Sequence, residues 1–534
     1  MITRRTFIKT AAAAGATLAF RPLDAFGRGT GTATAGFGVH PFVESRPDAV
    51  FIMRTNVDVK TNASAIKLAG LAFGRSAFQS RNVEDGGIPL THDIAIKPNL
   101  TCRCSWDPRY TVEQTMGIVT DCNFVEGVIE SLKELGLPGN RFYLREVSCP
   151  ADFADSGYTA MAQRTGAELR DLSAKVGVIS ESDLQWIDVP GGVWFRRIPY
   201  LRPVNSSASW LLNIAKLKAH GMGITLCAKN LQGSIAHNYQ AHCTAYSGTM
   251  DMATADISPT AMADILANYN RHVAAGIPRW DRPGEDGGLW QETWATRCLD
   301  NNSVTHPGLH IIEGVYGRDG NFIDGPSPEG LATDYMTNVI LFGKNPFHVD
   351  NVGHWLAGHE PGNFGLFHLA VERGLASVLN PMRIPVYEWQ ADGAATLTVL
   401  TDFQRTLLKT YYLQRNYNGQ SEPYWHLVNE PYDYGTAGVD PSRAGPPVAF
   451  GVRQISPNPA HGLASIEFSV PKAGGVRLEV YNALGEVVAV LVDGYRMQGA
   501  HLVVWNASQR PPGIYFCRLL SGGASAAKKM ILIR

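Results

Sequence analysis

The alternation of apolar strand-like runs with helical patterns constrains the fold of this chain more than any other feature. From about residue 36 to residue 435, runs such as DIAIKPN, SWLLNIA and LHIIEGV alternate with segments whose apolar residues repeat at helical spacing. This order is typical of βαβ units around a mixed or mostly parallel sheet. We therefore expect an α/β domain with helices over roughly Ala63 to Phe73, Glu113 to Leu135, Ala261 to Val273, Val349 to Leu356 and Gly365 to Arg373.

A second, smaller domain is predicted where the pattern changes after about Pro446. Short alternating strands such as ASIEFSV, VRLEVYN, HLVVWNA and GIYFCRLL follow one another there, separated by Gly and Pro. That pattern predicts a small all-β sandwich of the Ig-like kind. The 534 residues also exceed the usual length of one domain. We expect a signal peptide and linker at 1–35, the central α/β domain at 36–437, a linker at 438–452 and the β-sandwich at 453–534.

The N-terminal segment MITRRTFIKTAAAAGATLAF places Arg4 and Arg5 before Phe7 and Lys9. An Ala-rich apolar run follows that is too short to span a membrane as a stable helix. The segment resembles a twin-arginine signal peptide. The resemblance implies the twin-arginine translocase as a partner, and a route that carries folded proteins, often with a cofactor loaded beforehand. No other segment is apolar for long enough to predict a membrane span, so we expect none in the mature chain.

The C-terminal sequence carries a second resemblance. SPNPA, VYNALGEVV, PPGIYFCRL and the final KKMILIR are similar to the type A C-terminal sorting domain of type IX secretion. An Ig-like repeat of the flagellar-hook-capping kind is the alternative, and the position at the end of the chain favours sorting. The resemblance implies the outer-membrane type IX machinery as a partner. The protein would then pass through the periplasm and reach the cell surface or be secreted.

Charge and cysteine spacing exclude several classes of protein. A net charge of −1 argues against a nucleic-acid partner, which requires clustered Lys and Arg. The eight cysteines include a Cys102-x-Cys104 arrangement but no C-x-x-C pair, so an intrinsic iron–sulfur cluster is not expected. The chain also lacks a P-loop, a G-x-S-x-G elbow and an H-E-x-x-H sequence. Common nucleotide hydrolases, serine hydrolases and zinc proteases are therefore unsupported.

Polar residues follow two predicted strands at the edge where ligands bind in such sheets. Lys97 and Asn99 end the run DIAIKPN, and Lys216, Lys218 and His220 follow SWLLNIA. Residues two apart share a face in extended chain, so the last three predict one cationic face. The carboxyl ends of parallel strands are where an open α/β sheet binds its ligand.

The next segment extends this predicted site. Gly221 and Gly223 allow a turn, and ITLCAKNLQG then reads as a helical turn that bears Lys229, Asn230 and Gly233. Backbone N–H groups at the start of that turn would add to the positive field. The alternative is a set of solvated lysines, since lysines at strand ends are usually exposed. Few counter-charges accompany these residues in the sequence, which favours an anionic ligand.

The same motifs resemble a known family. IKPNL, LLNIAKLKAHGMGITLCAKNLQG, IIEGVYG and LFGKNPFHVDNVGHWLAG look like domain-of-unknown-function family 362, over most of residues 90 to 360. Some members of that family carry a ferredoxin-like cluster segment, whose cysteine spacing this chain lacks. The layout also resembles, by analogy only, the nickel-pincer lactate racemases, in which Lys and His flank a cofactor between two lobes.

Acidic and imidazole residues complete the candidate set. Glu313 ends LHIIEGV and Asp350 follows NVILFG, so we expect both to face the crevice of the lysines and to position a metal or move a proton. For Asp350, capping of a helix N-terminus is an equal alternative. His237, His242 and Cys243 are ligand types for zinc, copper or nickel, but complete no metal signature, so hydrogen-bonded histidines are favoured.

Three hypotheses about function follow from these residues. In the first, the chain is an exported enzyme that depends on a metal or organic cofactor and acts on an anionic small molecule. Lys216, Lys218, His220, Glu313 and Asp350 would be its catalytic residues. In the second, the same crevice of a non-catalytic surface protein captures an anion or metal. In the third, the central domain is structural cargo without a ligand.

Overall fold

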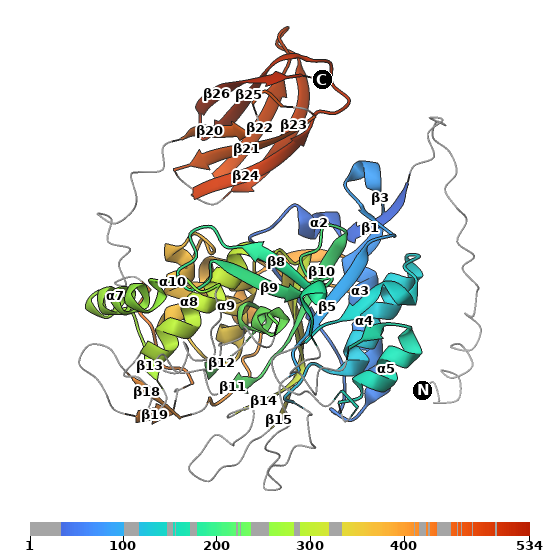
Figure 1. Ribbon diagram of the computed structural model, residues 1–534, viewed down its shortest axis with the longest axis vertical. Helices are drawn as coiled ribbons and strands as arrows, with labels where there is room; N and C mark the ends of the chain where they lie inside the picture. The colour runs from blue at the N-terminus through green and yellow to red at the C-terminus, as the bar shows by residue number, and fades with distance from the viewer. Residues whose placement is uncertain are drawn as a thin grey trace, which may run out of the picture.

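The computed structural model describes two folded parts, one ending at Tyr434 and one beginning at Phe450 (Figure 1). The twin-arginine sequence at residues 4–9 and the Cys102-x-Cys104 arrangement lie outside the described residues. No helix in the described part is both long and apolar enough to cross a membrane. The described residues are 34–100, 117–146, 153–154, 156–170, 179–220, 223–224, 226–236, 256–281, 289–319, 334–410, 412–415, 423–425, 428–434, 450–456, 458–460, 462–471, 474–496 and 499–533.

A nine-stranded mixed sheet forms the centre of the first part, in the order β17-β16-β2-β15-β14-β10-β5-β6-β7. The strands β14, β10, β5, β6 and β7 run parallel to one another, whereas β15 is antiparallel to both β14 and β2. The predicted α/β fold class is thereby confirmed. The strands are β2 (Val50–Arg54), β5 (Asp93–Pro98), β6 (Phe142–Leu144), β7 (Glu168–Leu169), β10 (Ser209–Lys216), β14 (Leu309–Arg318), β15 (Asp334–Gly343), β16 (Val386–Trp389) and β17 (Ala395–Thr398).

Helices cover both faces of this sheet. The helices α3 (Ala63–Ala77) and α4 (Cys122–Glu134) pack on the face that presents Leu212 and Ile214 of β10. The helices α6 (Cys227–Asn230) and α9 (Pro346–Leu356) pack on the opposite face, which presents Ala215. The remaining helices are α2 (Pro41–Glu44), α5 (Tyr158–Thr165), α7 (Ala261–Ala274), α8 (Leu289–Val304) and α10 (Gly365–Glu372).

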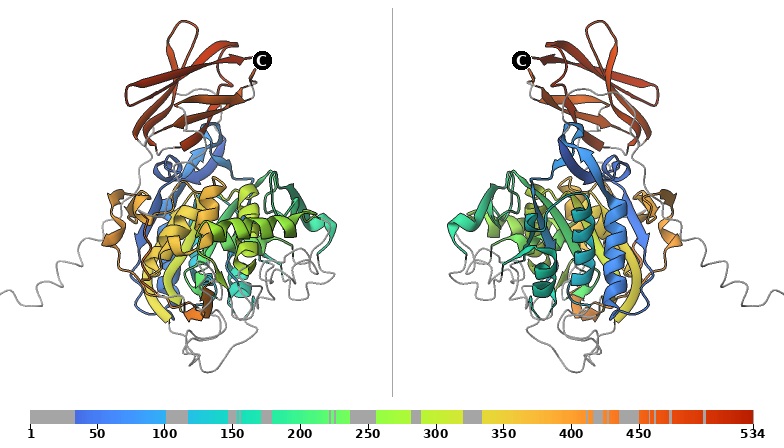
Figure 2. Two further views of the ribbon diagram at one scale, coloured as in Figure 1. Left: turned by 90° about the vertical axis from the view of Figure 1, so that its left-hand side faces the viewer. Right: turned by 90° about the vertical axis from the view of Figure 1, so that its right-hand side faces the viewer.

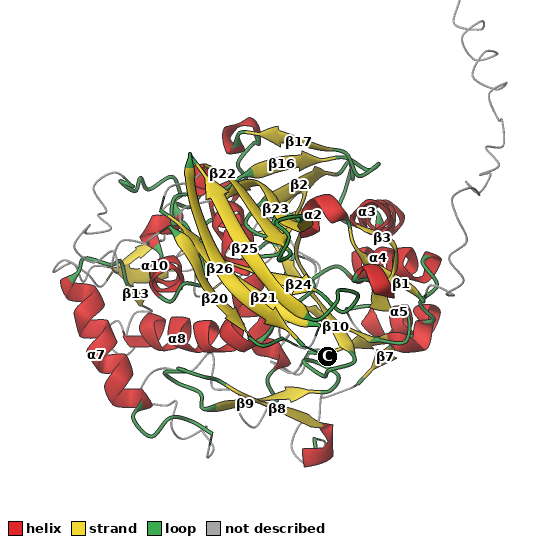
Figure 3. Ribbon diagram, turned by 90° about the horizontal axis from the view of Figure 1, so that it is seen from above, coloured by secondary structure: helices red, strands yellow, loops and turns green. Residues whose placement is uncertain are grey.

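Smaller sheets surround the main one. A three-stranded sheet joins the segment before β2 to that after α3, and a hairpin projects beside α8 (Figure 3). Two short strands that follow β10 form another hairpin. These strands are β1 (Ala35–Val39), β3 (Phe78–Asn82), β4 (Ile88–Pro89), β8 (Leu184–Asp188), β9 (Arg197–Leu201), β11 (Ala219–His220), β12 (Gly223–Ile224), β13 (Trp280–Asp281), β18 (Tyr412–Arg415) and β19 (Pro423–Trp425).

Helix boundaries depart from the sequence prediction where capping residues decide them. The helix expected from Glu113 begins at Cys122, because the Asp121 carboxylate accepts a hydrogen bond from the Asn123 amide at 2.8 Å. The helix expected from Val349 begins earlier, at Pro346. The Asn345 side chain caps it by accepting from the amides of the following turn. In both helices the capping residue, and not the periodicity of apolar residues, sets the first residue.

The second part consists of two antiparallel sheets that share one apolar core (Figure 2). Their orders are β20-β21-β24 and β23-β22-β25-β26. Trp505 and Tyr515, from different sheets, meet edge to face with ring centroids 5.2 Å apart. An all-β C-terminal region was expected and is confirmed. Its strands are β20 (Gly451–Ser456), β21 (Leu463–Val470), β22 (Gly474–Tyr481), β23 (Val487–Arg496), β24 (Gly499–Asn506), β25 (Gly513–Ser521) and β26 (Ala524–Leu532).

Glycines let α3 and α4 approach closely. A Cβ placed on Gly70 of α3 would lie 2.1 Å from the Phe124 carbonyl oxygen, and one on Gly127 of α4 would lie 2.2 Å from the Lys67 carbonyl oxygen. Both clashes involve backbone atoms, which cannot turn aside as a side chain can. The two helices therefore depend on glycine at their crossing.

We predict that Gly70→Ala destabilises the protein by about 1–3 kcal/mol because of this overlap. The sign of the change in the free energy of unfolding is diagnostic, because Ala in a helix interior normally stabilises the helix by about 1 kcal/mol relative to Gly. Urea unfolding measures the effect. The control Leu68→Ala, at a side chain 62% exposed on the same helix, should change the free energy of unfolding little. A Gly70→Ala protein as stable as the unaltered one would contradict the packing.

A buried charge cluster joins α7, α8 and α10. The His272 imidazole lies 2.9 Å from a Glu292 oxygen and 3.0 Å from a Glu372 oxygen, and Arg279 donates to Glu292 at 2.7 Å. Burial opposes a charge on His272, but the two carboxylate hydrogen bonds outweigh it and raise the pKa of the imidazole. Burial likewise opposes ionisation of Glu292, yet its cationic partners lower the pKa of that carboxyl.

These shifts predict a stability maximum in mildly acidic solution. The raised pKa of His272 makes its contribution complete below the unfolded value of 6.5 and removes it as the pH rises through the folded pKa. The pKa of Glu372 is lowered to about 2, so its contribution is complete above the unfolded value of 4.5 and is lost as the pH falls. We expect His272→Gln to flatten the alkaline side of a plot of Tm against pH. Unchanged pH dependence in that variant would refute the assignment.

Candidate functional site

The carboxyl ends of β5, β6, β10 and β14 bring most of the predicted site residues together. Lys97 pairs in register with Asn213 of β10, and Lys216 pairs in register with Glu313 of β14. Asn213 and Lys216 point to opposite faces of the sheet, because side chains alternate along a strand. The predicted site therefore consists of two clusters, one on each face.

The Lys97 cluster lies on the α6 face and comprises Lys97, Glu146, Asn230, Asn99 and Asn213. Lys97 Nζ donates to Glu146 Oε2 at 2.7 Å and to Asn230 Oδ1 at 3.1 Å. Asn230 Nδ2 donates in turn to Asn213 Oδ1 at 2.8 Å, and Asn99 Nδ2 donates to Asn230 Oδ1 at 3.1 Å. The cluster fixes α6 against the ends of β5 and β10. Both charged side chains of the ion pair are 1% exposed.

Burial dominates the electrostatics of Lys97. Loss of solvation lowers the pKa of its ammonium, opposed by the nearby Glu146 carboxylate, and the charge of Lys229 lowers it further. Lys229 is half-buried, and no carboxylate among the described residues forms an ion pair with it. The Asn99 Oδ1 atom is also buried, without a hydrogen-bond partner in the described structure. An unneutralised cation and an unmet acceptor therefore lie beside the ion pair.

Gly233 is the residue that lets the turn after α6 approach the ion pair. A Cβ there would lie 2.2 Å from Glu146 Oε1 and 2.8 Å from Lys97 Nζ. Gly233 is one of the residues expected to bind the ligand. The structure places it against the ion pair, where only a residue without a side chain fits.

The Lys216 cluster lies on the α4 face and comprises Lys216, Glu313, Tyr316 and Asp121. Lys216 Nζ donates to Glu313 Oε2 at 2.7 Å and lies 3.4 Å from the centre of the Tyr316 ring. Tyr316 donates its hydroxyl to Asp121 Oδ2 at 2.9 Å. Neither side chain of the ion pair is exposed. Burial raises the pKa of Glu313, and Lys216 opposes that shift.

Lys218 and His220 continue along the chain from Lys216. Lys218 is 1% exposed and His220 is 4% exposed, at the start of the β11–β12 hairpin. These lysines and this histidine are thus buried, and the solvated-lysine alternative does not describe them. Both residues have interaction partners in the folded protein.

Asp350 forms no ion pair with a lysine of the described structure, contrary to the expectation that it shares their crevice. The reason is the direction of β15. Since β15 is antiparallel to β14, its last residue, Gly343, pairs with His310 near the amino end of β14. The Asp350 carboxylate instead accepts hydrogen bonds from the Cys227 and Ala228 amides at 2.7 and 2.8 Å.

This contact also corrects the expected role of α6. The carboxylate of Asp350 occupies the first amides of that helix, so they do not add positive field for a ligand. Burial raises the pKa of Asp350 to about 7, and the two amide hydrogen bonds act in the opposite direction. The capping alternative for Asp350 describes its contacts, although the helix that it caps is α6 and not its own.

The described histidines do not gather into a metal site. His348, His354, His359 and His368 each contact a backbone carbonyl oxygen, those of Asp48, Ile224, Leu408 and Gly362 respectively. The described ranges contain no group of three or more His, Cys, Asp or Glu placed to hold a metal ion. His237, His242 and Cys243 lie outside those ranges.

Sequence reasoning missed several residues of the two clusters. Glu146 supplies the counter-charge of Lys97, and Asp121 accepts from the Tyr316 hydroxyl. Thr120 donates to the Ile214 carbonyl and accepts from the Asn99 amide. A signal existed for Glu146, since it lies near the end of the strand-like run RFYLREV, as Lys97 lies near the end of DIAIKPN. Asp121 gave no such signal because it precedes a helix.

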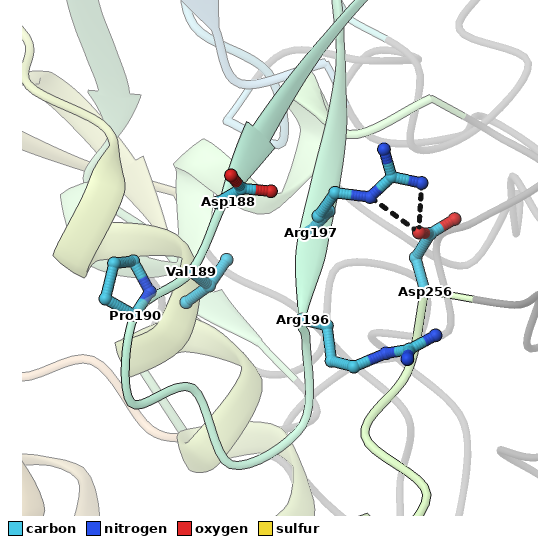
Figure 4. Close-up of a pocket in the computed structure, with 6 residues that line it drawn as sticks. All are labelled: Asp188, Val189, Pro190, Arg196, Arg197 and Asp256. Atoms are coloured by element: carbon cyan, nitrogen blue, oxygen red, sulfur yellow. Dashed lines mark hydrogen bonds and ion pairs between the residues drawn. The ribbon is translucent and has the colours of Figure 1, made fainter.

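A separate hollow lies beside the β8–β9 hairpin, with a volume of about 430 Å³ (Figure 4). It is lined by Asp188, Val189, Pro190, Arg196, Arg197 and Asp256. Arg197 forms a two-pronged contact with one oxygen of Asp256, at 2.7 and 3.0 Å. None of the predicted site residues lines this hollow.

Comparison with known proteins agrees with the two-part organisation. Residues 94–354 match the family model of the domain of unknown function DUF362. Residues 454–533 match that of the secretion system C-terminal sorting domain. The chain carries a DUF362 domain and a sorting domain. The sorting domain indicates export to the cell surface or secretion through the type IX machinery.

Three solved structures are similar to short stretches of this chain. Dimeric latent PorU from Porphyromonas gingivalis is 24% identical over 15% of this chain and 9% of its own, with a TM-score of 0.13. PorZ, a surface component of the type IX secretion system of that organism, is 11% identical over 28% of this chain and 20% of its own, with a TM-score of 0.13. An uncharacterised Bacillus anthracis protein is 9% identical over 16% of this chain and 85% of its own, with a TM-score of 0.14. The chain thus spans less than two thirds of the first of these structures, and none of the curated proteins matches it.

We predict that Gly233→Ala disrupts the Lys97–Glu146 ion pair. The added methyl group must displace one partner of a buried pair, and separating such a pair costs about 3–5 kcal/mol. Thermal unfolding measures the loss. Ser234→Ala is the matched control, because it removes one local hydrogen bond in the same turn, worth about 1 kcal/mol. Equal losses of stability in Gly233→Ala and Ser234→Ala would argue against close contact between Gly233 and the ion pair.

Proposed function

We propose that the DUF362 domain of this exported protein binds an anionic small molecule at the carboxyl ends of β5 and β10 and acts on it as an enzyme. The observation that carries the proposal is the half-buried Lys229, which lies close enough to Lys97 to lower its pKa and has no carboxylate partner among the described residues. Holding two ammonium groups together against one carboxylate is unfavourable without an anion.

The polar groups around Lys229 support the same ligand class. Gln232 is 1% exposed, and both polar atoms of its side chain lack a hydrogen-bond partner in the described structure. Buried amides without partners are rare in folded proteins, and an unobserved ligand or water accounts for them. Carboxylate and phosphate oxygens are the acceptors that such a donor set selects.

Buried lysines next to carboxylates also support catalysis. The pKa of Lys97 is lowered by burial and that of Glu313 is raised by burial. Groups with shifted pKa values at the end of a sheet are typical of proton-transfer sites. Lys218, His220 and Glu313 remain the proposed catalytic groups beside Lys216, and Asn99, Lys229 and Asn230 the proposed ligand-binding groups.

Binding without turnover is the second candidate. It is favoured by the ion pairing of both Lys97 and Lys216, because each amine must release its proton before it can act as a base. Incubating the pure protein with a mixture of carboxylate and phosphate metabolites distinguishes the two. Mass spectrometry would detect a changed compound if the protein is an enzyme, and only depletion by binding if it is a capture protein.

Export through the twin-arginine route fits a domain that folds with its ligand or cofactor before it crosses the inner membrane. We propose this route for residues 1–35, ahead of sorting by the C-terminal domain.

We predict that Lys229→Met lowers the affinity for inorganic phosphate or oxalate by about tenfold, the effect of losing one charge-assisted hydrogen bond. Isothermal titration calorimetry on the full chain measures it. Lys133→Met is the control, since Lys133 pairs with Glu130 on the surface of α4 and should leave the affinity unchanged. Binding that is equally strong in Lys229→Met, or absent from the unaltered protein, would overturn the proposal.

A further inference from the structure

Gln232 is a buried amide that forms none of its side-chain hydrogen bonds within the described structure. Its side chain is almost completely enclosed, and neither Nε2 nor Oε1 has a partner there. A primary amide holds an N–H donor and an accepting oxygen side by side. Exchanging the two atoms by a flip of the amide leaves the same demand, for a group that both donates and accepts.

The position of Gln232 places this amide beside Lys229. Gln232 lies in the turn η4 (Leu231–Ser234), and Asn230 and Leu231 keep right-handed helical backbone angles where η4 continues α6. Side chains three residues apart are neighbours in an α-helix and in a 3₁₀-helix alike. The next residue, Gly233, packs against the Lys97–Glu146 ion pair. The amide therefore belongs to the same end of the sheet as the half-buried ammonium of Lys229.

Acceptors as well as donors are left over at this end of the sheet. Gln232 Oε1 and Asn99 Oδ1 are both buried and receive no hydrogen bond in the described structure. A fully deprotonated anion, such as a carboxylate or sulfate, offers only acceptor oxygens. It would satisfy Lys229 and Gln232 Nε2 but would set its own lone pairs against the two unmet acceptors.

A phosphate that keeps one proton meets both demands. It carries P–O⁻ oxygens for the donors and a P–O–H for an acceptor. The second pKa of a phosphate monoester is about 6, so this form is present near neutral pH. Carboxylic acids, with pKa values of about 4, have lost their proton there.

We propose that Gln232 selects a singly protonated phosphate group, with Nε2 donating to a phosphate oxygen and Oε1 accepting from the P–O–H. Lys229 binds the negative charge of the same group. This assignment rests on the proposed function and narrows its ligand from anions in general to free phosphate or a phosphate monoester.

Gln232→Met tests the assignment, because it removes the donor and the acceptor and keeps a side chain of similar length. Gln291→Met is the matched control. Gln291 is also a buried glutamine, but its Oε1 accepts from the Trp280 amide at 2.8 Å. Isothermal titration calorimetry on the full chain, at a pH of about 6, close to the second pKa of a phosphate monoester, compares phosphate, methyl phosphate, sulfate and oxalate.

We expect the unaltered protein to bind phosphate or methyl phosphate about tenfold more tightly than sulfate and oxalate, the effect of one hydrogen bond to a charged group. The tighter of the two phosphates identifies free phosphate or a monoester as the source. The preference should fall below about threefold in Gln232→Met and persist in Gln291→Met. Equal affinity of the unaltered protein for phosphate, sulfate and oxalate would overturn the selection by Gln232 and leave the proposed function intact. Absence of binding to any of the four would overturn both.

Thermal unfolding without ligand separates this role from a structural one. Replacing a buried amide that lacks partners by an apolar side chain should leave Tm unchanged or raise it, whereas Gln291→Met should lower Tm by removing a formed hydrogen bond. A lower Tm in Gln232→Met, with its preference for phosphate retained, would contradict the assignment.

Discussion

Two buried ion pairs, Lys97 with Glu146 and Lys216 with Glu313, determine how the central domain is arranged at the ends of its parallel strands. Each pair joins a lysine on one strand to a glutamate of the neighbouring strand segment, Glu146 just after β6 and Glu313 within β14. Charges taken out of water are costly, so each pair requires further hydrogen bonds. Asn230 supplies one of these to Lys97, and the need for close approach explains why Gly233 follows α6.

The sequence predicted the fold class and the residues at the strand ends because both depend on local patterns. Alternation of strand and helix indicated a mixed or mostly parallel sheet. Lys97 and Lys216 were expected at the carboxyl ends of their strands, and they lie there, in β5 and β10. The sequence did not predict on which face of the sheet each lysine lies. Side chains alternate along a strand, so their faces can be compared between two strands only when the register of pairing is known.

Other features depend on contacts between distant parts of the chain. Strand β15 runs antiparallel to β14, and Asp350, which follows it, caps α6 and does not pair with a lysine. Nothing in NVILFG marks the direction of the strand. Glu146 lies 49 positions from Lys97 in the chain, and Glu313 lies 97 positions from Lys216. Counter-charges seemed scarce because they are distant from the lysines in the sequence. In the structure Glu146 pairs with Lys97, and Glu313 pairs with Lys216.

The proposed function rests on Lys229, whose charge is not neutralised by a carboxylate of the described structure. Native mass spectrometry, with elemental analysis, of protein exported through its own signal tests this most directly. If the centre binds an anion, the unaltered protein carries a stoichiometric small-molecule mass whose occupancy falls in Lys229→Met. A clean mass of the bare chain in both the exported and the cytoplasmically purified protein would contradict it.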